Sequence, residues 1–315
     1  MILEVEGLHV ELGGIEALRN VSFAVERGAC LGIVGESGSG KSLTCRTLVG
    51  LEGRIGARVA RGRVVMGGVN LVGADGAEWQ RVRGRQIALV PQTSLGSMDP
   101  LMRVGRQLAE TVRALDPAAD PWARALELLE QVEMPHARAV LDSYPHELSG
   151  GMRQRVMIAL AIAGRPSLLI ADEPTTALDV TVQRRILRLL TALRKESGMS
   201  MVFVSHNLNV VRSVSDFVTI MYAGTTVETG RVEEVLARPA HPYTRALLAA
   251  QPDGTDRAAP LASIPGAAPR PGHMPHGCPY QPRCPSRAEA CAVESKAIVI
   301  DDLHETSCVR AGEVM

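Results

Sequence analysis

The chain of 315 residues lacks a net charge, a long apolar run and any visible internal repeat. Its 34 Lys and Arg residues balance its 34 Asp and Glu residues. This balance gives no indication of a nucleic-acid partner or an acidic tail. The longest apolar run has about nine residues, at 156–164, whereas a membrane-spanning helix needs about 20. We therefore expect the chain in the cytoplasm, or at a membrane through a partner.

The N-terminus also lacks the features of a signal peptide. Residues 1–12 read MILEVEGLHVEL, with Glu4 and Glu6 among alternating apolar residues. A signal peptide begins with basic residues and continues with a solid apolar stretch, so we expect a first strand here instead. In a reducing cytoplasm, clustered cysteines are not expected to form structural disulfides.

Short apolar runs alternate with helical patterns along most of the chain. The runs at 29–35, 85–91, 167–173 and 200–206 are typical of central strands that are covered on both faces. Residues 181–198 predict a helix that ends at Gly198. Its expected apolar face holds Val182, Ile186, Leu189, Leu190 and Leu193. Strands that alternate with helices predict an α/β sheet.

Other segments depart from this alternation. Residues 63–71 and 217–230 predict antiparallel hairpins, with turns at Gly67-Gly68 and near Ala223-Gly224. The pattern is mainly helical between about 92 and 164, which indicates an inserted helical subdomain. The last 65 residues hold nine of the 19 prolines and four of the six cysteines, with a strand pattern only at 297–301. This composition predicts a small lobe that needs a staple to hold its shape.

The strongest motif is GESGSGKS, residues 35–42. It matches the phosphate-loop pattern G-x-x-x-x-G-K-[ST], with an apolar strand before it and a helical pattern after it. Its glycines let successive amide groups face phosphate oxygens at a helix N-terminus. We expect Lys41 to reach the β- and γ-phosphates and the Ser42 hydroxyl to bind Mg²⁺.

Two adjacent carboxylates end the apolar run LLIADEP, residues 168–174. Adjacent side chains at a strand end diverge, so Asp172 can hold Mg²⁺ while Glu173 polarises the attacking water. Without a phosphate loop upstream, two solvated acids at a strand end would be the simpler interpretation. With the loop present, we predict a catalytic pair.

The segment LSGGMRQR, residues 148–155, resembles the signature sequence of ABC-type ATPases. A serine hydroxyl and exposed glycine amides at a helix start also form an anion site on physical grounds. The resemblance implies a head-to-tail dimer in which ATP lies between the phosphate loop of one subunit and the signature of the other.

Further motifs resemble the same family in the same order, and the similarity covers roughly residues 1–250. Gln92 matches the Q-loop glutamine, residues 175–179 match the D-loop, and His206 matches the switch histidine. The resemblance implies catalytic roles for Glu173, His206 and Gln92. It implies ATP contacts for Leu12, Gly35, Glu36, Ser37, Gly38, Ser39, Gly40, Lys41, Ser42 and Leu43; Mg²⁺ contacts for Ser42, Gln92 and Asp172; contacts with the other subunit's ATP for Ser149, Gly150, Gly151 and Gln154; and a D-loop contact for Asp179.

Two positions depart from the family pattern. Leu12 stands where an aromatic residue usually stacks on adenine, and leucine lacks the aromatic face. Asn207 stands where an acidic residue often follows the switch histidine. We expect weaker contact with the base and altered coupling between the two sites, while phosphate and Mg²⁺ contacts still dominate ATP binding.

The features that the chain contains and those that it lacks indicate which branch of the ABC family it resembles. One cassette without a long coiled coil, a second cassette or a membrane span is similar to a separate importer subunit. HPYTRALL and the tail pattern IPG…GCPY…PRCP…C…C, which together cover residues ~239–315, resemble the ATPase subunits of oligopeptide and dipeptide permeases. Close relatives in that family import nickel, metal chelates or glutathione. A soluble ABC regulator without a permease is the alternative from another class.

By this resemblance the chain is a P-loop NTPase of the ABC type, with an antiparallel β subdomain and an inserted helical subdomain. It implies an ATPase domain at 1–250, a helical subdomain at about 93–160 that docks on the permease, and a Cys-rich domain at 251–315. The implied partners are a second ATPase subunit, either a paralogue or a copy of this chain, and two membrane-spanning permease subunits. An extracytoplasmic binding protein takes part indirectly, and the implied location is the cytoplasmic side of the cell membrane.

The tail cysteines are Cys278, Cys284, Cys291 and Cys308, with 5, 6 and 16 residues between them. No C-x-x-C pair occurs in the tail, so the common zinc-finger and ferredoxin spacings are missing. Four thiolates can still hold either a 4Fe–4S cluster or Zn²⁺, and free thiols or stress-formed disulfides remain open. Because the permease family tail is associated with a 4Fe–4S cluster in some members, we expect the cluster.

Overall fold

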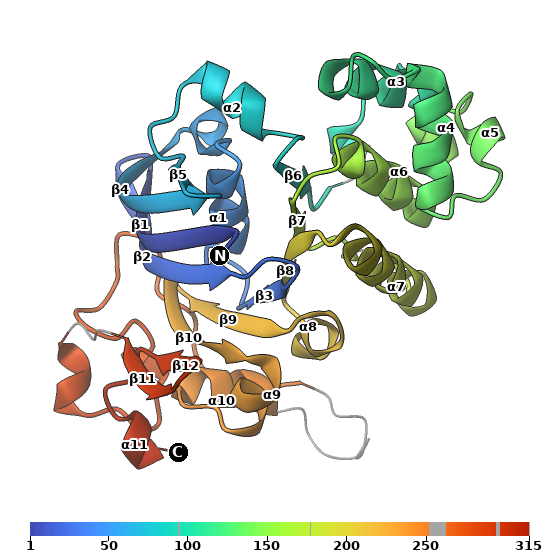
Figure 1. The fold of residues 1–315 in the computed structure, drawn as a ribbon. Coiled ribbons are helices and arrows are strands. Elements are labelled where there is room, and N and C mark those ends of the chain that lie inside the picture. Colours follow the sequence, from blue (N-terminus) through green and yellow to red (C-terminus); the bar gives the residue numbers. More distant parts are fainter. Residues whose placement is uncertain (94, 177, 252–262, 294–296, 315) are drawn as a thin grey trace. The chain divides into compact units, whose positions relative to one another are not determined.

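The structure is a computed structural model of the whole chain, and it describes residues 1–93, 95–176, 178–251, 263–293 and 297–314. The chain forms two compact units. The first comprises Met1, Leu3–Gly73 and Phe203–Met315, and the second comprises Ala74–Val202 together with Ile2. Each unit is described by itself below (Figure 1).

The N-terminal part of the first unit is an antiparallel sheet with the strand order β2-β1-β4-β5. Its strands are β1 (Leu3–Leu12), β2 (Ile15–Val25), β4 (Ala57–Met66) and β5 (Val69–Asn70). Along β1, the buried apolar residues Leu3, Val5, Leu8 and Val10 alternate with more exposed polar residues, which is the pattern of a strand with one buried face. The predicted first strand and the predicted hairpin around Gly67-Gly68 are confirmed.

A second sheet of the same unit carries the strands β11-β12-β10-β9-β3 in that order. They are β3 (Cys30–Val34), β9 (Phe217–Tyr222), β10 (Thr225–Arg231), β11 (Ile298–Asp301) and β12 (His304–Thr306). β3 and β9 are parallel, while β10 pairs antiparallel with both β9 and β12. Two strands of the tail therefore extend the sheet that carries the phosphate loop, as the red ribbon beside β10 shows (Figure 1).

Short helices complete the first unit. They are α1 (Lys41–Leu48), η1 (Glu52–Ile55), α8 (Leu208–Val214), α9 (Val232–Ala237), α10 (Pro242–Ala249), η4 (Gln281–Arg283), η5 (Glu289–Ala292) and α11 (Ala311–Val314). α10 begins at a proline in its first turn, where the missing N–H has no partner to lose.

The second unit pairs β6 (Ile87–Val90) in parallel with β7 (Leu168–Asp172). Between these strands the chain is helical, as predicted: η2 (Leu95–Ser97), α3 (Val104–Leu115), α4 (Pro121–Gln131), α5 (Ala137–Val140), η3 (Pro145–Glu147) and α6 (Gly150–Ile162). α2 (Gly76–Val82) precedes β6 and α7 (Val180–Ser197) follows β7. The chain passes from this unit to the first one within β8 (Ser200–Ser205).

The predicted helix at 181–198 is confirmed as α7, and Gly198 ends it in the left-handed conformation. Its buried face differs in part from the prediction. Leu187 and Arg194 are buried, whereas Val182 and Leu193 are half-buried. Among the residues that the structure describes, none of the helices combines the length and the apolar character that a membrane crossing requires.

Candidate functional site

The phosphate-loop motif, residues 35–42, joins β3 to α1 as predicted. Gly38 and Gly40 both have positive φ angles, of 81° and 97°, which L-residues with side chains rarely adopt. A Cβ atom on Gly40 would also lie 2.4 Å from Leu18 Cδ2. Backbone conformation and close packing therefore both require glycine at this position.

The side of the loop that faces the β9–β10 hairpin is equally tight. A Cβ atom on Gly35 would lie 2.1 Å from the carbonyl oxygen of Met221. The amide of Gly224 donates to the carbonyl of Ser39 over 3.1 Å. The hairpin therefore fixes the path of the loop from one side.

Lys41 is only 5% exposed, and its ammonium group lies inside the loop. Its Nζ donates to the carbonyls of Gly35 and Glu36 at 2.8 and 3.0 Å. The first turn of α1 contains no acidic residue that would repel an anion at the helix N-terminus. The loop therefore combines a buried cation with a helix N-terminus, and both features favour an anion.

Glu36 makes contacts that the motif alone does not predict. Its amide donates to the hydroxyl of Tyr243 over 2.9 Å, and its carboxylate accepts from Arg283. Burial alone would lower the pKa of Arg283, but the hydrogen bonds with Glu36 and Tyr222 outweigh it and raise this pKa. The guanidinium is therefore charged, and the C-terminal segment reaches the phosphate loop.

Two further predicted residues lie in the first unit. His206 is exposed directly after β8, and Asn207 caps α8 by accepting from the amides of Asn209 and Val210 at 2.9 and 3.3 Å. Asparagine thus replaces an acidic residue at a position where both cap a helix well. Leu12 ends β1 and is 41% exposed, so its side chain is accessible to a base.

The predicted catalytic pair lies in the second unit. Asp172 is buried at the end of β7, and Glu173 follows with a φ of 47°, an unusual value for a residue with a side chain. The Glu173 carboxylate accepts from Gln92 Nε2 at 3.0 Å and from Thr176 Oγ1 at 2.9 Å. The structure therefore brings the predicted Q-loop glutamine to the predicted base, and Thr176 is an addition to the set.

The signature residues begin α6. Ser149 caps the helix by accepting from the amide of Met152 over 3.3 Å, and Gln154 is buried. A Cβ atom on Gly151 would lie 2.6 Å from Val182 Cγ1, so the signature contacts the start of α7. This helix start is capped by Asp179, which accepts from the amides of Thr181 and Val182.

The D-loop precedes that cap. A Cβ atom on Gly150 would lie 3.3 Å from Leu178 Cδ2, so the loop borders the signature segment. One residue of the predicted D-loop, Ala177, lies outside the described residues. Signature and D-loop therefore meet within one unit, which sequence spacing alone did not predict.

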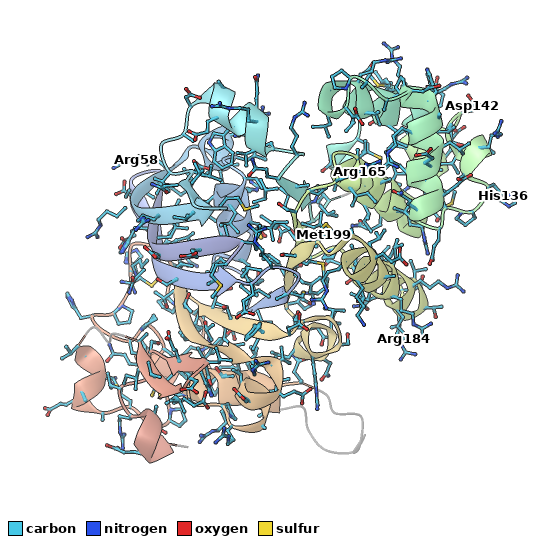
Figure 2. The ribbon with its side chains drawn as sticks, in the orientation of Figure 1. Arg58, His136, Asp142, Arg165, Arg184 and Met199 are labelled. Carbon is cyan, nitrogen blue, oxygen red and sulfur yellow. The ribbon has the colours of Figure 1, made fainter. Side chains whose placement is uncertain are left out.

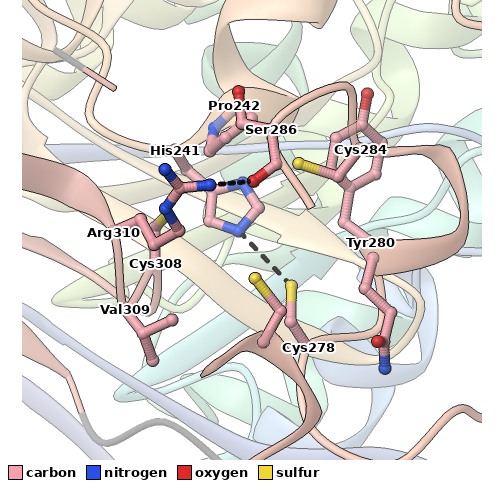
Figure 3. A pocket seen from close by; sticks show the side chains of 11 residues that line it. His241, Pro242, Cys278, Tyr280, Cys284, Ser286, Cys308, Val309 and Arg310 are labelled. Atoms are coloured by element: carbon pink, nitrogen blue, oxygen red, sulfur yellow. Dashed lines mark hydrogen bonds between the residues drawn. The ribbon is translucent and has the colours of Figure 1, made fainter. Parts of the chain in front are cut away.

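The four tail cysteines line one cavity of the first unit (Figure 3). They share it with His241, Tyr280 and Arg310 among others. All six cysteines of the chain lie among the described residues, and none forms a disulfide. Within the described part of the chain, no three His, Cys, Asp or Glu side chains already form a closed metal-ligand group. Four thiols and an imidazole are donor types that a soft metal prefers, but their positions here do not form a metal-ligand set.

Burial decides the ionisation of these thiols. It raises the pKa of Cys278 to about 11, and it also raises the pKa values of Cys284 and Cys308. Each of these thiols therefore keeps its proton at neutral pH unless a bound cation stabilises the thiolate.

His241 faces the same cavity in a defined tautomer. Burial lowers its pKa to about 4 against an opposing effect of Glu228, so the ring is neutral. Its Nδ1 accepts from the amide of Tyr243 over 3.0 Å, which leaves the proton on Nε2. That Nε2 lies 4.0 Å from Cys278 Sγ, as the dashed line in Figure 3 shows. His241 is therefore a donor toward sulfur in this arrangement.

The start of α10 is fixed by a buried carboxylate that the sequence did not point to. Glu228 accepts from the amides of Ala240 and His241 at 2.7 and 2.9 Å and pairs with His304 Nε2 at 2.7 Å. Because all of these groups are buried, the network holds His241 rigidly at the cavity.

Comparison with known proteins shows the family to which the chain belongs. The family described as "ABC transporter" matches residues 18–176, and the family described as "Oligopeptide/dipeptide transporter, C-terminal region" matches residues 227–291. The dipeptide transport ATP-binding protein DppD of Lactococcus lactis is 45% identical over 90% of this chain and 82% of its own length. The oligopeptide transport ATP-binding protein OppD of Haemophilus influenzae is 40% identical over 99% of this chain and 98% of its own length.

Solved structures give the same result at the level of the fold. The dimeric ATP-binding cassette MJ0796, bound to ADP and Pi, is 28% identical and has a TM-score of 0.65. The match covers 73% of this chain and 98% of that one. The chain therefore belongs to the ABC transporter ATPases, with the C-terminal region found in oligopeptide and dipeptide transporters.

Proposed function

We propose that the chain is the ATP-hydrolysing subunit of an importer for oligopeptides or dipeptides. The observation that carries the proposal is the joint presence of a phosphate loop holding Lys41 and of a C-terminal region matching peptide transporters. The named relatives, DppD and OppD, are ATP-binding proteins of dipeptide and oligopeptide transport.

The catalytic roles follow from the chemistry of each group. The amides of the loop, Lys41 and Ser42 would bind the phosphates. Ser42 and Asp172 would hold Mg²⁺, which supplies charge that neutralises the phosphates. Glu173, held by Gln92 and Thr176, polarises the attacking water as general base. His206 contacts the γ-phosphate, and Leu12 packs on the base.

Ser149, Gly150, Gly151 and Gln154 contact the ATP of a second ATPase subunit in this proposal, and Asp179 lies at the dimer interface. The start of α6 supports it, because Gly150 and Gly151 lie in a first turn that has the neutral cap Ser149 and no acidic residue. The MJ0796 cassette forms a dimer, which supports the same arrangement. The dimer closed on ATP would bind one conformation of the permease more tightly than the other, and would thereby shift the permease toward that conformation.

The proposed docking surface for two permease subunits is the helical segment at about 93–160. Leu101 is 88% exposed and Trp122 is 49% exposed there, and exposed apolar side chains favour a protein partner. His136 and Asp142 lie on the exposed side of the same segment (Figure 2). The chain would then work at the cytoplasmic side of the cell membrane, beneath a permease fed by an extracytoplasmic binding protein.

The proposed division is an ATPase domain at 1–250 and a Cys-rich domain at 251–315, of which 252–262, 294–296 and 315 lie outside the described residues. We further propose that Cys278, Cys284, Cys291 and Cys308 hold a 4Fe–4S cluster, with Zn²⁺ as the alternative. Their shared cavity and the His241 donor support a soft, sulfur-bound metal group. Such a group supplies a structural cross-link; no catalytic step requires it.

Membrane fractionation tests the proposal. The tagged chain is expected in the membrane fraction and should co-purify with two permease subunits and a second ATPase subunit. A chain that stays monomeric and separate from any permease would contradict the importer and favour the regulator.

A further inference from the structure

Glu36 of the phosphate loop is held at two points by residues of 227–291, the segment that matches the C-terminal transporter region and is called the C-terminal segment below. Its carboxylate pairs with Arg283, which lies between Cys278 and Cys284 in the sequence. Its backbone amide donates to the hydroxyl of Tyr243 in α10. One loop residue is therefore fixed both at its side chain and at its main chain.

Arg283 is rigid enough to act as an anchor. Its side chain is only 5% exposed, and Nη1 and Nη2 donate to the two Glu36 oxygens at 2.8 and 3.2 Å. The other donors are satisfied as well: Nε donates to the carbonyl of Pro265 at 2.7 Å, and Nη2 to that of Ile264 at 3.0 Å. A bidentate pair with all donors satisfied fixes both distance and direction.

Tyr243 is anchored on its other side. Its ring lies 4.6 Å from that of Tyr222 and 5.3 Å from that of Tyr280, and all three side chains are buried. Tyr280 lines the cysteine cavity, and so does His241, which lies two residues before Tyr243. The His241-Pro242-Tyr243 segment therefore reaches the cavity at one end and the phosphate loop at the other.

The held residue is also the one that positions the loop lysine. The carbonyl of Glu36 accepts from Lys41 Nζ at 3.0 Å, next to the carbonyl of Gly35. A shift of Glu36 would therefore move an acceptor of the ammonium group that binds phosphate.

We propose that Arg283 and Tyr243 are positioning residues for ATP binding, which hold Glu36, and through it Lys41, from the C-terminal segment. Arg283 has a second effect, because it neutralises a carboxylate in a loop that must bind a polyanion. Without Arg283, that carboxylate loses the cation that it pairs with in the described part of the chain, and its charge repels phosphate. The inference rests on the proposed ATPase function and adds a task for the C-terminal segment to it.

The test uses the purified full-length chain with four variants: Arg283→Gln, Glu36→Gln, the double variant and Arg238→Gln. Arg238 is the matched control, because it forms an ion pair with Asp301 at 3.6 Å in the same part of the chain. ATPase rates and thermal unfolding are measured for each. We expect Arg283→Gln to raise the KM for ATP about tenfold, the loss of one charge-assisted contact, with kcat changed less than about threefold.

The double variant separates positioning from general damage. Because Glu36→Gln removes the repelling carboxylate, it should return the KM of Arg283→Gln to within about threefold of the Glu36→Gln value. A KM for Arg283→Gln equal to that of Arg238→Gln, or an undiminished penalty in the Glu36→Gln background, would overturn the inference. Absence of ATPase activity in the wild-type chain would instead contradict the proposed function.

Tyr243→Phe is the second, gentler variant, since it removes one hydroxyl and keeps the ring. It leaves the Glu36 amide without its acceptor, so the KM for ATP should rise about threefold. An unchanged KM in this folded variant would refute the role of Tyr243.

Discussion

The guanidinium of Arg283 and the carboxylate of Glu36 form two hydrogen bonds across 247 positions of sequence. The pair joins the cysteine segment to the first variable residue of the phosphate loop. This contact ties the C-terminal region to the phosphate loop, and it explains why Arg283 is buried although it is charged.

The cysteine cavity should contain a metal group. Anaerobically purified protein is expected to carry iron and acid-labile sulfide, and Cys284→Ser should lose both, because one of four ligands is removed. Cys30→Ser is the control, since Cys30 is buried in β3 outside the cavity, and its metal content should stay unchanged. Elemental analysis gives the answer; one zinc per chain without iron would replace the cluster by the zinc alternative.

Glu173→Gln should separate ATP binding from hydrolysis. The variant keeps the shape and a hydrogen-bond acceptor for Gln92, but it cannot take a proton from water. We expect an ATPase rate lowered by about 10²- to 10⁴-fold with ATP affinity within about threefold of wild type. Glu196→Gln, an exposed change on α7, should leave both values unchanged. Wild-type turnover in Glu173→Gln would remove Glu173 from the mechanism.

Gly151→Ala should damage the signature through Val182. The added Cβ would lie 2.6 Å from Val182 Cγ1, so α6 and α7 must separate, which costs about 1–3 kcal/mol of unfolding free energy. The double variant with Val182→Ala restores the space and should regain at least half of the lost stability and ATPase rate.

Gly76→Ala is the matched control, because a Cβ atom there meets nothing within 4 Å. Denaturant unfolding and ATPase assays read both effects. Equal losses in Gly151→Ala with and without Val182→Ala would show that this contact is not the cause.

His241 should make the fold less stable in mild acid. Its pKa is about 4 in the folded chain and 6.5 when exposed, so below pH 6.5 the unfolded chain binds a proton that the folded chain does not. The free energy of unfolding should therefore fall between pH 6.5 and 4, by about 2 kcal/mol at pH 5 from this group. His241→Asn can still cap α10 and should lack this component.

Urea unfolding at pH 7 and pH 5 measures the difference for wild type and His241→Asn. The same decrease in both proteins would mean that another group causes it.

Most of the correct predictions about the fold and the site came from motifs whose residues are neighbours in the sequence. The phosphate loop, the strand that ends at Asp172 and the cap at Ser149 each depend on neighbouring residues, so their local sequence defines their geometry. The hairpin at Ala223-Gly224 was predictable for the same reason.

Contacts between distant segments could not be predicted in this way. Glu228 pairs with His304 across 76 residues because the tail strand β12 extends the sheet beside β10. Arg283 pairs with Glu36 across 247 residues, and no local pattern indicates that contact. The apolar periodicity of α7 also predicted its buried face incompletely. Arg194 is buried there although it is charged, and a pattern of apolar residues cannot indicate a buried charge. A single sequence records neither the register of such strands nor the partner of a buried charge.

Peptide uptake by the reconstituted importer shows directly whether the chain drives peptide import. Proteoliposomes would contain the chain, its second ATPase subunit and both permease subunits, with the binding protein and labelled oligopeptides added. ATP should drive peptide accumulation with the wild-type chain, and Glu173→Gln should abolish it while Glu196→Gln does not. ATP hydrolysis without any accumulation of dipeptides or oligopeptides would contradict a role in peptide import.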